Sequence, residues 1–503
     1  MKGRRQTWKV MTSVNGSSTK QSRLHKGKAG FTSLYILMIL SSLLFLMLAV
    51  IEGASGYALR SHAESACTLA GESVLSEFNK ELWERYGIFA LSAHNERLTR
   101  LATYYISENM DAGGQALLKI ERLDCSADTQ NYPALDAERF AQQVRHTASH
   151  LIAGEVLNGM TNLLPFEHLS DTLLWFDEIK AGMDGEIRRA EEALEPPGST
   201  EPDADGGSAS SGENQQDRRK VRTLLKRYRE SQSPGEESAQ WGKSIEPGLA
   251  SRVLPSSLLE IPSRMTALSR IAAPKAEDAA EVEYIVRMCS HATNIASHSA
   301  LDLEVEYILF GSAGDSENAT LMRSNLFALR SALNLSHIYG DSVKKSEVAA
   351  MAAVVSAFIP MPLAEFLIAC IWSGLEAACD VDALFSGQTV PFVKGHGDWR
   401  TGLDGSTLHW DSQPADDSAA GKFGKYPDYL RVFLWMQPST SRRVRLMDVM
   451  QLNVASVSGE TFRFVDYAYG FDLQAEFEKK IRLPGYALSG LRKGTVKQTY
   501  AYR

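Results

Sequence analysis

The sequence predicts a mainly α-helical protein with a small β element near its C-terminus and a single N-terminal transmembrane helix that continues outside the membrane. Three observations predict this class. Residues 31–51 form an uncharged apolar run, apolar residues recur at helical spacing through much of the remaining chain, and the tail alternates aromatic with other residues. With 503 residues, 44% of them hydrophobic, the chain can also bury a sizeable core outside the membrane.

The run from Phe31 to Ile51 has the length of a membrane span, because about 20 residues at ~1.5 Å each cross a hydrocarbon core of ~30 Å. The leader, residues 1–30, carries eight Lys and Arg residues and no acid. Basic flanks stay in the cytoplasm. We therefore expect a single-pass cell-membrane protein with its N-terminus inside and its bulk outside. A cleaved secretory signal is the alternative, although Ala49–Ala54 offers only a weak cleavage match.

No proline interrupts residues 52–85, so we expect one continuous helix of about 50 residues that ends at Tyr86-Gly87. Glu52, at the exit of the span, either pairs with a basic group on a neighbouring chain or lies among lipid headgroups in water. Small residues on one stripe permit close helix packing. They are Gly53, Ala54, Gly56, Ala63, Ala66 and Ala70.

Residues 52–194 read as a helical extracytoplasmic region, followed by a flexible polar linker at 195–248. Further helices are expected at Arg97–Met110, Ala137–Met160 and His168–Leu194. Inside the linker, Asp217–Glu230 predicts a short basic helix with Val221, Leu224, Leu225 and Tyr228 on one stripe. Such a helix either binds an anionic membrane or acidic partner, or is a solvated helix that pairs with the acidic linker; the second interpretation is favoured.

Residues 249–503 predict an α-rich domain with a C-terminal β element. The expected helices are Ala276–Ser299, one from Asp315 or Ser316 to Ile338, one capped by Asp341 and ended by Pro360, Leu363–Cys379, Tyr429–Met436 and Val444–Asn453. Leu363–Cys379 is the most apolar of these, and we expect it in the core rather than in the membrane. The alternating tail predicts the β element.

Charge and cysteine content exclude several classes. The net charge is −8, and with +8 in the leader the remainder carries −16, which argues against nucleic acid as the main partner. The five cysteines are widely spaced without a CxxC pair, which excludes zinc-ribbon and thioredoxin readings. Cys370 and Cys379 lie in an apolar helical stretch, so we expect buried thiols there.

The sequence contains no P-loop, GxGxxG, HExxH or GxSxG motif, and it predicts no catalytic residue, cofactor or metal. His291 and His298, seven residues apart, could share a helix face, but ordinary surface or core histidines are favoured over a metal site.

Two other groups of residues stand out. The carboxylates of Asp302, Glu304 and Glu306 alternate, and a solvated face is favoured over a cation site. The loop with His396, Asp398 and Trp399 is a plain turn or a binding loop, with the turn favoured. We expect Arg442, Arg443 and Arg445 to pair with acids of their own domain.

Two segments resemble known families. "KAGFTSLYILMIL" resembles the leader junction of type IV prepilins and TadE-like pseudopilins, with Gly30 and Phe31 at the possible processing junction and Tyr35 where that pattern has glutamate. The string "IEGASGYALRSHAESACTLAGESVLSEFNKELWERYGIFAL" resembles uncharacterised Gram-positive membrane proteins found with tight-adherence-like pilus genes. Matching segments downstream include "WSGLEAACDVDALFSGQTVPFVKGHGDW" and "YPDYLRVFLWM".

The resemblance implies a structural function. We expect a pseudopilin-like, non-catalytic component of a tight-adherence or type-IV-pilus-like apparatus, with membrane lipid and other pilus-like subunits as partners through the N-terminal helix. Glu52, Gly53 and Gly56 are the residues expected to serve helix assembly. The alternative is a membrane-tethered adhesion or ligand-binding ectodomain that does not polymerise.

Overall fold

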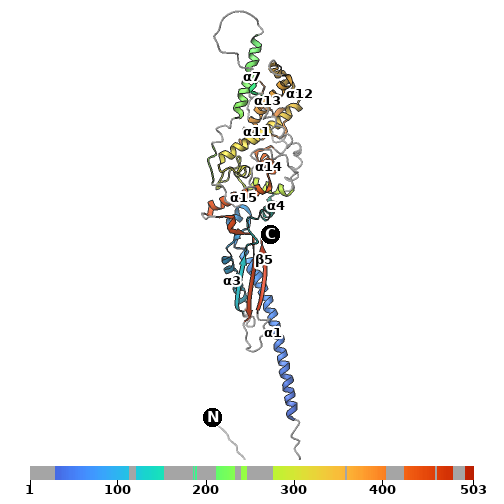
Figure 1. The fold of residues 1–503 in the computed structure, drawn as a ribbon, viewed down its shortest axis with the longest axis vertical. Coiled ribbons are helices and arrows are strands. Elements are labelled where there is room, and N and C mark those ends of the chain that lie inside the picture. The colour runs from blue at the N-terminus through green and yellow to red at the C-terminus, as the bar shows by residue number, and fades with distance from the viewer. Residues whose placement is uncertain are drawn as a thin grey trace, which may run out of the picture.

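The fold is taken from a computed structural model that describes the following parts of the chain: 29–112, 120–151, 185, 187–189, 211–232, 240–245, 276–356, 360–403, 424–458, 462–479 and 493–502. The described residues form an elongated molecule with helix α1 at one end and helix α7 at the other (Figure 1). The molecule is mainly helical, with a small sheet that contains the C-terminal strands, as the sequence predicts.

Helix α1 runs from Ala29 to Leu75, and it is long and apolar enough to cross a membrane by length and composition. It ends earlier than predicted. A separate helix, α2 (Lys80–Tyr86), follows after a short break. The break arises because the Asn79 side chain accepts a hydrogen bond from Leu82 N at 2.8 Å and so caps a new helix.

Helix α2 ends at Gly87, whose φ of 66° lies in the left-handed region. The predicted end of the helix at Tyr86-Gly87 is therefore confirmed, and glycine adopts this conformation most easily. A Cβ at Gly87 would lie 2.7 Å from the Thr147 side chain, so glycine is also needed for close packing.

The first of two packed units, here called the stalk, is built on one side of the second half of α1. Helix α3 (Asn95–Ala112) packs beside α1, and a three-stranded antiparallel sheet covers both in the order β2-β4-β5. Its strands are β2 (Ile120–Asp128), β4 (Gly470–Lys479) and β5 (Lys493–Ala501). Figure 1 shows β5 running alongside α1 and α3. The β element of the tail therefore includes a strand, β2, that the sequence pattern did not predict.

The second unit, here called the head, is helical. Its helices are α4 (Ala137–Leu151), α7 (Ser211–Gln232), α9 (Ala276–Met288), α10 (Glu304–Phe310), α11 (Asp315–Gly340), α12 (Ser342–Val355), α13 (Met361–Phe385), α14 (Tyr426–Met436) and α15 (Ser439–Ser458). Short 3-10 turns η4 (His396–Asp398) and η5 (Phe464–Asp466) lie between them. Strands β1 (Leu91–Ser92) and β3 (Tyr467–Ala468) pair where head and stalk meet.

Most predicted head helices are present, with shifted ends. Asp341 caps α12 by accepting hydrogen bonds from Val343 N and Lys344 N, as expected. Residues 276–299 are an exception, because α9 ends at Met288 and a loop follows. Helix α13 is apolar and long enough to cross a membrane, yet 67% of its most apolar stretch is buried inside the head. This confirms the expectation that the helix lies in the core. The predicted helix at His168–Leu194 lies mostly outside the described residues.

Helix α7 corrects the favoured interpretation of a solvated basic helix. Its apolar stripe, Val221, Leu224, Leu225 and Tyr228, is fully buried in the head core. Tyr228 packs against α13 at Gly374, where a Cβ would lie 2.4 Å from the ring. The stripe fits α13 because glycine leaves room for the tyrosine ring, so α7 is a core helix with one basic, exposed face.

Candidate assembly surface of the N-terminal helix

The first half of α1 is exposed on all sides. Apart from Leu48, which is partly buried, the large apolar side chains from Leu34 to Ile51 are each more than half exposed. Their burial would stabilise by about 25 cal/mol for each Å² removed from water, so this stretch requires an apolar surrounding that the rest of the described chain does not supply. A membrane anchor or a signal sequence has this property.

The second half of α1 is covered on one side by its own stalk. Ala63, Ala66 and Ala70 are fully buried against the sheet. The Tyr500 ring of β5 lies over Gly71, where a Cβ would come within 2.2 Å of it. These small residues therefore allow close packing, as expected of the stripe, and in this part the packing is within the chain.

Glu52, Gly53 and Gly56 lie between the two halves and are partly exposed. A Cβ added at Gly53 would meet no atom within 4 Å, so nothing in the described chain occupies the space beside it. The small-residue stripe is thus divided into an internal part that packs the stalk and a part near Glu52 that stays open.

Gly30 and Phe31, the possible processing junction, lie in the first turn of α1. Tyr57 and Leu69, farther along the same helix, keep 75% and 51% of their surface exposed. They are twelve residues apart and form no continuous patch, so the exposed apolar surface of α1 is concentrated before Glu52.

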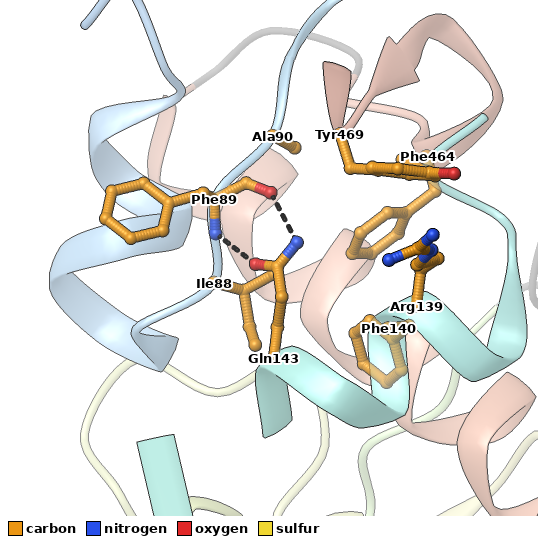
Figure 2. A pocket seen from close by; sticks show the side chains of 9 residues that line it. Ile88, Phe89, Ala90, Arg139, Phe140, Gln143, Phe464 and Tyr469 are labelled. Carbon is orange, nitrogen blue, oxygen red and sulfur yellow. Dashed lines mark hydrogen bonds between the residues drawn. The ribbon is translucent and has the colours of Figure 1, made fainter. Parts of the chain in front are cut away.

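A small pocket lies at the junction of head and stalk (Figure 2). The Gln143 side chain pairs with both backbone groups of Phe89, at 2.8 and 3.2 Å, and the Arg139 guanidinium lies 5.5 Å from the centre of the Tyr469 ring. The space inside holds roughly one water molecule. Its lining is already hydrogen-bonded within the chain, so it fits a structural junction better than a ligand site.

The histidine pair does not form a site. His291 is buried in the loop after α9, and burial, with Arg431 nearby, lowers its pKa to about 4. His298 is exposed in the same loop, so the two do not share a helix face; they are one core and one surface histidine, as the favoured interpretation had it. Among the described residues, no group of His, Cys, Asp and Glu side chains has the geometry to hold a metal ion.

The alternating acids do not form the solvated face that the sequence favoured, because two of the three are buried. Glu304 accepts a hydrogen bond from Ser290 N at 2.8 Å, and Glu306 accepts from Ala292 N at 3.1 Å and from the Tyr426 hydroxyl at 2.5 Å. These carboxyls fix the loop after α9 from inside the head. Asp302 pairs with Lys243 at 2.7 Å nearer the surface.

The arginine prediction is confirmed for two of three residues. Arg443 contacts Glu281 at 2.8 Å, and Arg442 contacts Glu281 at 3.5 Å. Glu281 also pairs with Arg145 of α4 at 2.8 Å, so this network joins chain segments from both sides of the linker. Arg445 instead donates to the backbone carbonyls of α10 at Ile308 and Leu309, because that helix end needs donors.

A buried cluster of charges was not predicted from the sequence. Lys394 precedes the predicted His396 loop, and its ammonium contacts Glu376 and Asp380 of α13. Asp380 also receives Arg330 of α11 at 3.0 Å. All four side chains are at most 1% exposed. The signal was the presence of two acids, Glu376 and Asp380, inside the most apolar helix of the head, which required buried partners.

Comparison with known proteins adds one finding. Residues 254–479 match the model of a family of unknown function (DUF5702). That region holds the head helices from α9 to α15 and the stalk strand β4, and it excludes α1, α4, α7 and β5. No curated protein and no solved structure matches the chain.

Proposed function

We propose that this protein is a membrane-anchored, non-catalytic structural component of a tight-adherence or type-IV-pilus-like surface apparatus. The observation that carries the proposal is the division of α1 into an exposed apolar half and a half that forms the core of the stalk. One uninterrupted helix thus joins the surface that needs a lipid or protein surrounding to the folded body. In this proposal the N-terminus is cytoplasmic, and the stalk and head are outside.

The open end of the small-residue stripe supports assembly through neighbouring helices. Within a membrane, helices associate where small residues allow their backbones to approach. Gly53 has this property, since nothing in the described part of its own chain fills the adjacent space. The partners of α1 are therefore lipid and the corresponding helices of other pilus-like subunits.

Glu52 lies one residue before this opening and is partly buried. A carboxylate close to the hydrocarbon layer is stabilised by a basic partner. In the assembled state, a neighbouring subunit's basic group takes this role; a position among hydrated headgroups is the alternative.

A photo-crosslinking side chain at position 57 tests whether this opening contacts another subunit. Tyr57 lies one helical turn after Gly53 and is 75% exposed, so its replacement leaves the glycine in place. Tyr57→p-benzoylphenylalanine, in the full chain in its native membrane, should give a covalent adduct with a second protein chain after irradiation. The matched control is Tyr104→p-benzoylphenylalanine, because Tyr104 is 58% exposed but lies on α3. No protein adduct from position 57, or equal adducts from both positions, would count against assembly through α1.

A tethered adhesion or ligand-binding ectodomain is a second candidate, and helix α7 favours it. Its exposed face carries Arg219, Arg222, Lys226, Arg227 and Arg229. Figure 1 places α7 at the end of the molecule opposite α1. A cationic face at that end suits contact with an anionic partner without any polymerisation.

A further inference from the structure

Lys394 places an ammonium group in direct contact with two carboxyls in the interior of the head. Its Nζ contacts Glu376 Oε1 and lies 2.7 Å from Asp380 Oδ1. The side chains are 1%, 0% and 0% exposed, respectively. Glu376 and Asp380 are four residues apart on α13, so both point to the same side of that helix.

We propose that Lys394 and Glu376 condense into an intramolecular amide, an isopeptide bond, with Asp380 moving the protons. The nucleophile, the electrophile and the proton carrier are then three side chains already in contact. The bond joins α13 to the loop that follows it. Without this bond, the same residues form only a buried ion pair.

Glu376 is held in place as the carboxyl that the amine attacks. Its Oε2 accepts hydrogen bonds from Thr401 N and Thr401 Oγ1, both at 2.8 Å, and Arg400 N donates to both carboxyl oxygens, to Oε1 at 2.9 Å and to Oε2 at 3.1 Å. Negative charge develops on one carboxyl oxygen when an amine adds to the carbon. Donors already directed at that oxygen stabilise the intermediate without reorganisation.

The surroundings of Lys394 enclose the contact with Glu376. The Trp399 ring centre lies 5.3 Å from Nζ, and Trp399 is only 8% exposed. The proton that must leave Nζ therefore has the two contacting carboxyls as its nearest acceptors. The same burial keeps bulk water away from the reacting carbon.

The reaction balances without any co-reactant. One proton passes from the Lys394 ammonium to Glu376 Oε1, and the freed amine forms the N–C bond to Glu376 Cδ. Asp380 takes a second proton from nitrogen and delivers it to Oε1. The C–Oε1 bond then breaks, one water leaves, and Asp380 is again a carboxylate.

Asp380 suits the role of proton carrier better than the role of the carboxyl that the amine attacks. Its Oδ2 accepts from Arg330 Nε and Asn334 Nδ2, both at 3.0 Å. Burial alone would raise the pKa of Asp380, but Arg330 and Lys394 together hold that pKa below its usual value. An ionised carboxyl resists attack by an amine, and Asp380 Oδ1, 2.7 Å from Nζ, is placed to take a proton from that nitrogen.

The product removes two buried charges. A buried ion pair costs desolvation energy on both sides, and a neutral amide does not. The bond also closes a loop between residues 376 and 394 in a chain whose five cysteines are all free thiols. Loop closure limits the unfolded state in the way that a disulfide does.

Peptide-level mass spectrometry of the purified full chain tests this directly. The expected result is a branched peptide in which Lys394 is linked to Glu376, is not cleaved by trypsin, and is lighter by one water than its two component peptides. Separate peptides of full mass would overturn the proposal. A Lys394–Asp380 link, which would place the bond on the other acid, would overturn it too.

Two variants distinguish the Lys394–Glu376 bond from any other reaction that lowers the peptide mass by one water. Lys394→Met should restore the full mass of the peptide containing Glu376. Lys344→Met is the matched control, because Lys344 is also buried and its Nζ lies 4.0 Å from the same Trp399 ring. The control should keep the branched peptide. Persistence of the water loss in Lys394→Met would contradict the assignment.

Discussion

At the scale of single residues, buried carboxyls organise the head. Glu304, Glu306 and Asp315 are each at most 1% exposed, and each accepts hydrogen bonds from backbone amides of the loop between α9 and α10. This loop has little regular structure to satisfy its amides, so the acids take the place of helix or sheet partners. An alternating acid pattern looks like a solvated surface in sequence, because the partner amides cannot be identified before the loop is folded.

Glu306 makes the stability of the head depend on pH. Burial raises its pKa from 4.5 to about 7, although Tyr426 and Ala292 donate hydrogen bonds to it. Because the folded-state pKa lies above the unfolded one, the stabilising contribution is complete below about 4.5 and is lost as the pH rises through about 7.

Glu306→Gln should remove this dependence. The free energy of unfolding of the variant, relative to wild type, should rise by about 3 kcal/mol between about pH 4.5 and about pH 7.5, the size expected when folding raises a pKa from 4.5 to about 7. Urea unfolding at a series of pH values measures it. The variant must be compared with wild type at each pH, because the lowered pKa of His291 makes the stability of both proteins change with pH in the opposite direction. A difference that stays constant with pH would show that Glu306 does not titrate in this range.

Predictions for single residues were confirmed where basic side chains lie in an acidic domain. Arg442 and Arg443 follow a Pro/Ser turn in an acidic domain, and they pair with acids as expected. The Lys394 cluster was not predicted, because its members come from α11, α13 and a loop that only the fold brings together. The sequence does show Glu376 within the apolar helix expected in the core, but it does not show which basic side chain reaches it.

At the scale of elements, helix existence was predicted better than helix ends or partners. Helix α1 was expected to reach Tyr86, but residues 76–79 break it, since the Asn79 cap competes with helix continuation. The Tyr86 side chain then lies in the head core, where its hydroxyl accepts a hydrogen bond from Asn453 at 2.7 Å. The short helix α2 is thus the connection between stalk and head.

Helix α7 shows the limit of periodicity. The i, i+3, i+4, i+7 stripe identified both the helix and its apolar face, but periodicity does not say what covers that face. The flanking polar linker favoured a solvated helix, whereas the complementary surface is α13, about 150 residues later in the chain.

Tyr228→Ala tests whether α7 belongs to the core. Loss of a buried ring that packs at Gly374 should leave a cavity and lower the free energy of unfolding by about 3–5 kcal/mol. Tyr104→Ala is the matched control, because Tyr104 is 58% exposed, and it should change that free energy by less than about 1 kcal/mol. Denaturant titration of both variants measures the effect. Equal, small effects would mean that α7 does not pack on α13.

At the scale of the whole molecule, the two units are each assembled from distant parts of the chain. In the stalk, β2 pairs with β4, so Cys125 lies opposite Ala475 in the register. In the head, α4 packs on α9 across the linker. The sequence predicts the helical class and the C-terminal strands, but not this pairing, because alternation identifies strands without identifying their neighbours.

The stalk and head are also joined by aromatic stacking. The rings of Trp83 and Phe89 stack at 4.0 Å, and those of Phe89 and Tyr502 at 4.9 Å. With the β1–β3 pair, these contacts tie α2 to the C-terminal end of the chain. A firm joint fits the proposed role, since a subunit anchored by α1 must hold its head in a defined position relative to its neighbours.

The central claim is that α1 anchors this protein in a membrane and packs it into a surface assembly. The most direct measurement is the recovery of the full chain after cells are sheared, with filaments, membranes and medium separated and compared. We predict that the chain is present both in membranes and in the sheared filament fraction. Recovery in membranes alone, with none in filaments, would contradict assembly, and release into the medium as a free soluble chain would contradict the anchor itself.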